Sequence, residues 1–227
     1  VLAAAAYRTG ERLYSEYYDE ISDYTRKGGV LHTEILLPAH APKCFCDRAT
    51  LWNAVEAAER HPKAQLAYSF DIALQNELSL NENIELARAF VQKEFVDRGM
   101  IADLAVHSPD KSGGIPNPHM HVMTTMRPLN PDGSFAPKQR REYMLDASGN
   151  RIRGSDGRCR FNAVHTTDWH SPERLELWRT AWCNAVNAKF EEKEIPSRID
   201  HRSYARQSLE QIPTVHEGPN VRKLEQK

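Results

Sequence analysis

The chain has 227 residues and a formal net charge of −1. This length can bury a full hydrophobic core and is typical of a single domain, which we take to be residues 1–227. The near-neutral charge excludes a uniformly basic DNA-coating protein, so any nucleic-acid surface must be local.

The first part of the chain alternates between helical and strand-like patterns. An alanine-rich, helix-favouring segment extends from residue 1 to about Tyr18. Gly28 and Gly29 interrupt it, and residues 30–37 are predicted to form a strand. Apolar spacing then predicts a helix over residues 49–61, followed by a strand over residues 65–74.

The middle of the chain is predicted to form a helix and then a hairpin. Asn81 is the expected N-cap of the helix, and Gly99 is its stop signal. Two strand-like runs follow, residues 101–107 and the run that begins at residue 119. The polar, Pro- and Gly-rich segment 108–118 joins them, which indicates an antiparallel hairpin.

The last third begins with a long irregular connection. Residues 127–168 are rich in Pro, Gly, Asp and Arg, and such long connections are usually functional or mobile. An amphipathic helix is predicted from Ser171 to about Lys193, and residues 194–227 form a polar tail. This order of elements predicts an α+β domain, an antiparallel sheet with helices packed on one face.

Three histidines converge in the predicted hairpin. His119 and His121 are two residues apart, so on a strand they face the same side, about 6.6 Å apart. Closing the hairpin brings His107 beside His119. Three neutral imidazoles on one face could hold a divalent ion and leave other coordination positions open. The alternative is that these are half-buried polar residues with no ligand.

The cysteines and the hydropathy bear on the cellular compartment. The four cysteines show no paired zinc spacing and are expected to be free thiols in a reducing cytoplasm. No apolar run approaches the ~20 residues needed to span a bilayer, and no signal peptide is recognisable. We therefore expect a soluble cytoplasmic protein without a membrane segment.

Basic residues concentrate in the long connection. Residues 138–160 contain seven basic and three acidic side chains, with Tyr143 and Phe161 available as stacking platforms for bases. The alternative is a solvated loop with incidental arginines. The candidate DNA-binding residues are Arg8, Arg26 and Lys27 near the N-terminus and Arg140, Arg141, Arg151, Arg153 and Arg158 in the connection.

Five segments in order resemble one protein family over nearly the whole chain. They are AAAAYRTG (residues 3–10), DYTRKG (23–28), ALQNEL (73–78), NPHMH (117–121) and RIDHRS (198–203). The sequence resembles the MobA/MobL family of plasmid mobilisation relaxases, members of the histidine-hydrophobic-histidine (HUH) endonuclease superfamily. Each segment alone is modest, but five in the right order are specific.

The resemblance implies a metal-dependent DNA relaxase. Such an enzyme nicks one strand at an origin of transfer through a 5′-phosphotyrosine intermediate and transfers the strand. By resemblance the nucleophile is Tyr7, and the metal ligands are His107, His119 and His121. The implied partners are single-stranded origin DNA, with or without a hairpin, and relaxosome accessory proteins. Mn²⁺ or Mg²⁺ is the expected ion, although three imidazoles also accept Zn²⁺ or Ni²⁺.

The sequence departs from the family pattern at two places. Ser69 stands where some relatives are expected to have a glutamate, which leaves Asp71 on the same strand face and Glu77 beyond it. We expect Asp71 to assist the histidines or act as a base; the alternative is a solvated charge on the strand face. Relatives also carry a strand and a polar loop before the small-residue helix, so an N-terminal strand is expected to be missing. Other tyrosines, at positions 17, 18 and 24, compete with Tyr7 for the role of nucleophile.

Two other functions compete with the relaxase. A rolling-circle replication initiator of the same superfamily would use the same groups at an origin of replication. A non-catalytic, single-stranded DNA-binding module would keep a structural metal, and its DNA would not be cleaved in the presence of Mg²⁺ or Mn²⁺.

Overall fold

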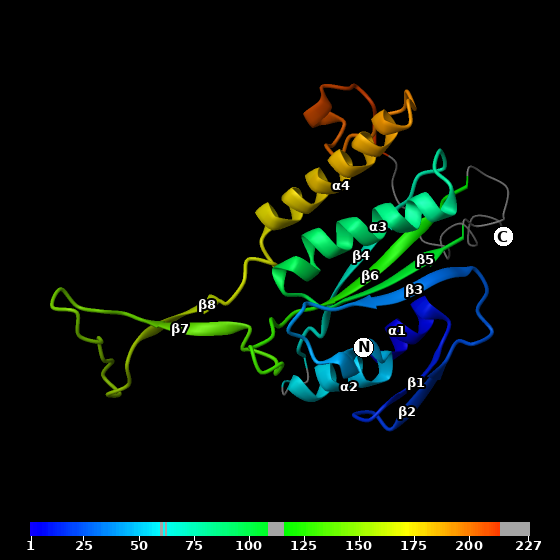
Figure 1. The fold of residues 1–227 in the computed structure, drawn as a ribbon. Coiled ribbons are helices and arrows are strands. Elements are labelled where there is room, and N and C mark those ends of the chain that lie inside the picture. The colour runs from blue at the N-terminus through cyan, green and yellow to red at the C-terminus, as the bar shows by residue number, and fades with distance from the viewer. Residues whose placement is uncertain (60, 62, 109–115, 214–227) are drawn as a thin grey trace, which may run out of the picture.

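A four-stranded antiparallel sheet forms the centre of the fold, in a computed structural model that describes residues 1–59, 61, 63–108 and 116–213. Its order is β3–β5–β6–β4 (Figure 1). The strands are β3 (Val30–Leu36), β4 (Ala67–Ala73), β5 (Ala102–His107) and β6 (His119–Thr125). All four lie close to their predicted positions. The predicted hairpin loop falls largely on residues 109–115, which lie outside the described residues.

Helices cover both faces of this sheet (Figure 1). On one face α3 (Leu80–Glu94) and α4 (Pro172–Glu192) pack over a core that includes Leu104 and Trp178. On the other face α1 (Leu2–Thr9) and α2 (Arg48–Ala58) bury a second core with Met123.

The α+β class with an antiparallel sheet is therefore confirmed, but the expected single helical face was wrong. Every residue of β5 is buried, so this strand packs on two sides. A strand that is buried on both faces lacks the strict polar and apolar alternation of a half-exposed strand. Residues 101–107 (IADLAVH) alternate only weakly between polar and apolar side chains, which agrees with burial on both faces.

The first helix is shorter than the sequence suggested. It ends at Thr9 because Gly10 adopts a left-handed conformation, φ 69°, and its N–H donates to the carbonyl of Ala6. Glycine takes this conformation without the steric cost of a Cβ atom. The chain then forms a hairpin of β1 (Arg12–Ser15) and β2 (Glu20–Asp23), so the predicted helix to Tyr18 was wrong beyond residue 9.

The sequence predicted the N-cap of one long helix correctly and the N-cap of the other incorrectly. Helix α4 begins after Ser171, as expected. Helix α3 begins after Ser79 instead of Asn81, because Ser79 and Glu82 form a reciprocal capping box. Short 3₁₀ turns, η1 (Lys43–Cys46), η2 (Val96–Arg98) and η3 (Ala205–Gln207), complete the helical elements.

The described half of the polar tail folds back on α4. Ile195 and Ile199 pack against the small cluster of Leu78, Val186 and Phe190. His201 contacts the side chains of Thr180 and Glu176 on the same helix. Residues 214–227 of the expected tail lie outside the described residues.

The long connection contains a projecting two-stranded arm (Figure 1). Strand β7 (Gln139–Tyr143) pairs with β8 (Phe161–His165), and two isolated bridges, between Leu145 and Arg151 and between Arg153 and Cys159, continue the pairing. The chain enters the arm from the Thr125 end of β6, which is the end opposite His119. The arm therefore lies away from the histidine end of the sheet.

The structure also describes the state of the cysteines and the hydropathy of the helices. The four cysteines are free, as expected. Within the described ranges, none of the helices is both long enough and apolar enough to cross a membrane.

A buried ion pair joins α2 to the central strand. Arg48, 8% exposed, donates from Nε and one terminal nitrogen to the carboxylate of Asp103, both at 2.8 Å. The indole N–H of Trp52 donates to the same carboxylate at 2.9 Å, and Arg48 also pairs with Glu11. Because each charge is buried, removing one partner leaves the other without compensation.

We predict that Asp103→Ala lowers the free energy of unfolding by about 3 kcal/mol, because it leaves the Arg48 guanidinium buried with only Glu11. Urea denaturation followed by tryptophan fluorescence measures the change. The double variant Arg48→Met/Asp103→Leu should recover part of the loss. An unchanged denaturation midpoint for Asp103→Ala would show that the pair does not stabilise the fold.

Candidate active site

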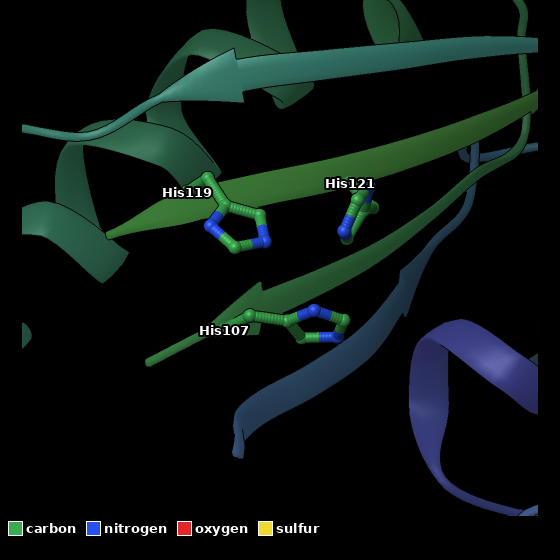
Figure 2. A group of neighbouring side chains, drawn as sticks. All are labelled: His107, His119 and His121. Atoms are coloured by element: carbon green, nitrogen blue, oxygen red, sulfur yellow. The ribbon is translucent and has the colours of Figure 1, made fainter. Parts of the chain in front are cut away.

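Three imidazoles meet at one end of the sheet (Figure 2). The β5–β6 register pairs His107 directly with His119, and His121 lies two residues further along β6 on the same face. The ring centroids lie 5.4 Å apart for His107 and His119, 4.6 Å for His107 and His121, and 5.0 Å for His119 and His121. One ring nitrogen from each residue lies within 4.8 Å of the others, so the triad could hold a metal ion.

Backbone carbonyls fix the orientation of two of these rings. Nε2 of His107 donates to the carbonyl of Arg8 on α1, 2.5 Å away. Nδ1 of His119 donates to the carbonyl of Asn117, 2.8 Å away. Because a carbonyl only accepts hydrogen bonds, each of these nitrogens carries the proton. The other nitrogen of each neutral ring keeps its lone pair for a metal ion.

A carboxylate holds the third ring. Asp71 on β4 is the direct register partner of His121, and Oδ1 of Asp71 accepts from Nδ1 of His121 at 2.5 Å. Nε2 of His121 therefore keeps its lone pair. Ser69, two residues before Asp71 on β4, accepts a hydrogen bond from Arg8 at 2.8 Å.

Burial disfavours the charged form of two of the three rings. Burial lowers the pKa of His107 to about 4, and the positive charge of Lys27 acts in the same direction. Burial also lowers the pKa of His121, although its hydrogen bond to Asp71 opposes the shift. Both rings are uncharged at neutral pH, which is the form that binds a metal. A donor set of three imidazoles, each with one ring nitrogen not bonded to the protein, fits a divalent ion.

Tyr7 lies beside the triad, on the last turn of α1. It immediately precedes Arg8, whose carbonyl is bonded to His107, and its side chain is 51% exposed. The ring of Tyr24 packs edge-on against it at 5.3 Å. The ammonium of Lys27 lies 3.9 Å from the centroid of the Tyr7 ring.

The competing tyrosines differ in their surroundings. Tyr17 and Tyr18 pack against each other in the β1–β2 turn, each 63% exposed, and line a hollow with Glu56 and Glu59 from the α2 region. Within the described part of the chain, neither ring forms a hydrogen bond or an aromatic contact with the three histidines. Tyr24 contacts Tyr7 but comes from the connection that follows β2.

The predicted DNA-binding residues form two separate groups. Arg8 and Lys27 lie at the site, and Arg26 is exposed in the same connection as Lys27. The other five lie on the arm: Arg140, Arg141, Arg151, Arg153 and Arg158.

Two arm arginines cover the aromatic rings expected to serve as base platforms. The guanidinium of Arg151 lies 3.9 Å from the centroid of the Tyr143 ring, and that of Arg141 lies 4.6 Å from that of Phe161. Two others pair locally with acidic neighbours, Arg140 with Glu142 and Arg158 with Asp156.

Sequence reasoning missed the contacts that tie α1 to the site. The bond from His107 to the Arg8 carbonyl involves a backbone acceptor, which leaves no trace in side-chain chemistry. The contact of Lys27 with Tyr7 joins residues 20 positions apart. The only available signal was that both residues lie inside segments of the family resemblance.

Comparison with known proteins assigns the family. The MobA/MobL family model matches residues 1–227. The chain is 36% identical over 238 residues to the conjugal transfer protein TraA of Rhizobium radiobacter, covering 100% of this chain and 20% of that protein. It is 34% identical to the probable mobilization protein MobA of Bifidobacterium longum, covering 98% of this chain and 41% of that protein.

A solved structure supports the same assignment. A chain from work on the molecular basis of vancomycin resistance transfer in Staphylococcus aureus matches with a TM-score of 0.73 and 31% identity, over 89% of this chain and 91% of that one. The chain belongs to the MobA/MobL family. It spans only 20% and 41% of the length of the two relatives named above.

We predict that Asp71→Ala weakens Mn²⁺ binding by about 10- to 100-fold, because His121 loses the acceptor that orients its ring. Isothermal titration calorimetry of the purified protein measures the affinity. Glu77→Ala is the matched control, since Glu77 is an exposed carboxylate six residues along the chain. Equal losses of Mn²⁺ affinity in the two variants would show that Asp71 has no specific role in metal binding.

Proposed function

We propose that this chain is the nicking domain of a plasmid mobilisation relaxase, which cleaves one DNA strand at an origin of transfer. Tyr7 is the nucleophile, and His107, His119 and His121 hold a divalent ion. The observation that carries the proposal is the hydrogen bond between His107 and the carbonyl of Arg8. This bond keeps the turn that bears Tyr7 next to the triad.

A divalent ion held by His107, His119 and His121 would supply Lewis-acid chemistry, stabilising the negative charge that develops on the phosphate during attack. Mn²⁺ or Mg²⁺ is the proposed native ion, and availability decides between these and Zn²⁺ or Ni²⁺. The protein residues fix its place. Asp71 orients His121, and two backbone carbonyls orient the other two rings.

The proposed reaction is a reversible transesterification. The phenol oxygen of Tyr7 forms a bond to phosphorus, and the bond from phosphorus to the 3′ oxygen breaks. The phenol loses its proton to solvent or a base, and the leaving oxygen takes up a proton as a 3′-hydroxyl. A phenol of pKa ~10 needs a nearby cation or base for this loss at neutral pH. The phosphodiester energy stays in the 5′-phosphotyrosine, so the strand can be resealed.

The arm is the proposed second contact with DNA. Its exposed arginines and two aromatic rings suit a single strand or a hairpin next to the nick site. Because the arm lies at the opposite end of the sheet from the triad, one DNA molecule would span the sheet to reach both. Accessory proteins of a relaxosome are further proposed partners.

We propose a role in plasmid transfer, and not in plasmid replication, because of the names of the related proteins. They are named as conjugal transfer and mobilisation proteins, over nearly the whole of this chain. A rolling-circle initiator would share the triad and the tyrosine but not these relatives.

We predict that the protein forms a covalent adduct with origin single strands in the presence of Mn²⁺, seen as a shifted band on a denaturing gel. EDTA should abolish the adduct, because the triad then lacks its ion. Tyr7→Phe should reduce the adduct at least ~10⁴-fold, since the phenyl ring has no nucleophilic oxygen.

Tyr17→Phe and Tyr24→Phe test the competing tyrosines. Both variants should still form the adduct if Tyr7 is the nucleophile. Adduct formation by Tyr7→Phe at the wild-type rate would refute the assignment of the nucleophile. Persistence of the wild-type adduct in EDTA would refute the role of the ion. A protein that binds origin DNA without any adduct would support the non-catalytic module instead.

We predict that changing Arg151, Arg153 and Arg158 to Ala lowers the slope of log affinity against log salt by about 2, because three phosphate contacts on a single strand are lost at ~0.7 each. Filter binding in the Tyr7→Phe background measures the slope without cleavage. An unchanged slope would show that these arm residues do not contact the DNA.

A further inference from the structure

Lys27 contacts Tyr7 through both the backbone and the ring of the tyrosine. Its ammonium donates to the carbonyl oxygen of Tyr7 at 2.7 Å and lies 3.9 Å from the centroid of the Tyr7 ring. The first contact satisfies a carbonyl in the last turn of α1, where a positive charge also complements the helix dipole. The second is a cation–π contact. One side chain thus restrains the whole Tyr7 residue.

The backbone around Lys27 is itself anchored to the end of α1. The N–H of Tyr24 donates to the carbonyl of Glu11, and the N–H of Lys27 donates to the carbonyl of Tyr24. The carbonyls of both residues lie within 4 Å of where a Cβ on Gly10 would stand. The backbone that carries the Lys27 side chain is therefore held in a fixed turn next to α1.

The charge of Lys27 has no anionic partner of its own. Among the described residues, neither Lys27 nor Arg8 forms an ion pair with a carboxylate; Arg8 donates to Ser69 and to the sulfur of Met123. Partial burial lowers the pKa of Lys27, and the charge of Arg8 adds to the shift. Two neighbouring cations without a counter-charge are unfavourable by themselves and become favourable when an anion binds between or beside them.

We propose that Lys27 is a positioning residue for the attack by Tyr7. It holds the phenol-bearing turn in place and supplies a positive charge over the ring whose oxygen loses its proton as it attacks the phosphate. This inference rests on the proposed function and adds to it a residue that acts on the nucleophile instead of on the ion. Arg8, whose carbonyl is occupied by His107, provides the second cation next to the same phosphate.

The test compares single-turnover adduct formation at saturating DNA and Mn²⁺, using the origin strand that the wild type cleaves. Lys27→Met should lower the rate constant about 100-fold, the usual effect of losing one preorganised electrostatic stabiliser. Lys27→Arg keeps the charge and should restore the rate to within about fivefold of the wild type. Lys93→Met is the matched control, because Lys93 is exposed on α3, on the other face of the sheet.

Binding measured in the Tyr7→Phe background distinguishes positioning from simple DNA contact. The additional Lys27→Met change should weaken DNA binding by only about two- to threefold, because it removes at most one screened phosphate contact. If the loss appears in affinity and the rate at saturating DNA is unchanged, the positioning role is refuted. A Lys27→Arg variant as slow as Lys27→Met would also refute the role of the charge.

Two further outcomes keep the inference separate from the proposed function. A wild type that forms no adduct overturns the proposed function. An active wild type with an equally active Lys27→Met overturns this inference alone. Should Lys27→Met fail to fold, judged by circular dichroism and Mn²⁺ binding, the comparison of Lys27→Gln with Lys27→Arg decides by the same rates.

Discussion

The hydrogen bond between His107 and the carbonyl of Arg8 joins the two parts of the site. The histidine belongs to β5 and the carbonyl to the last turn of α1, 99 residues apart in the chain. The bond sets the tautomer of the ring, and it also fixes where the end of the helix lies above the sheet. The proposed metal ligand His107 and the turn that bears the proposed nucleophile, Tyr7, are therefore positioned by one contact. A shift of α1 would disturb both together.

This contact depends on the packing beneath it. Ala5 and Ala6 are fully buried, so α1 can approach the sheet closely on its small-residue side. Gly10 ends the helix before it would extend past the triad. The buried pair of Arg48 and Asp103 fixes α2 against β5 on the same face. The alanine-rich start of the chain thus serves close packing as well as helix propensity.

Charge is distributed unevenly over a nearly neutral molecule. Arg8 and Lys27 flank Tyr7 without carboxylate partners among the described residues, whereas most arm arginines are paired locally or lie over aromatic rings. The first group suits a phosphate near the histidine triad, and the second suits a strand along the exposed arm. The overall charge is still −1, because 31 acidic residues offset 30 basic ones over the whole chain.

The sequence by itself determined the four central strands, the three long helices and the meeting of three histidines, because period-two and helical spacing are local properties. It also determined the family, through short segments in a fixed order. Only the tertiary structure decided that helices cover both faces of the sheet, that the first helix ends at Thr9, and that Ser69 binds Arg8; for Asp71, expected from the sequence to assist the histidines, it decided that the partner is His121. It alone placed Lys27 on Tyr7 and the arm at the far end of the sheet. These features depend on contacts between segments distant in sequence, often through backbone carbonyls, and no local pattern of side chains encodes them.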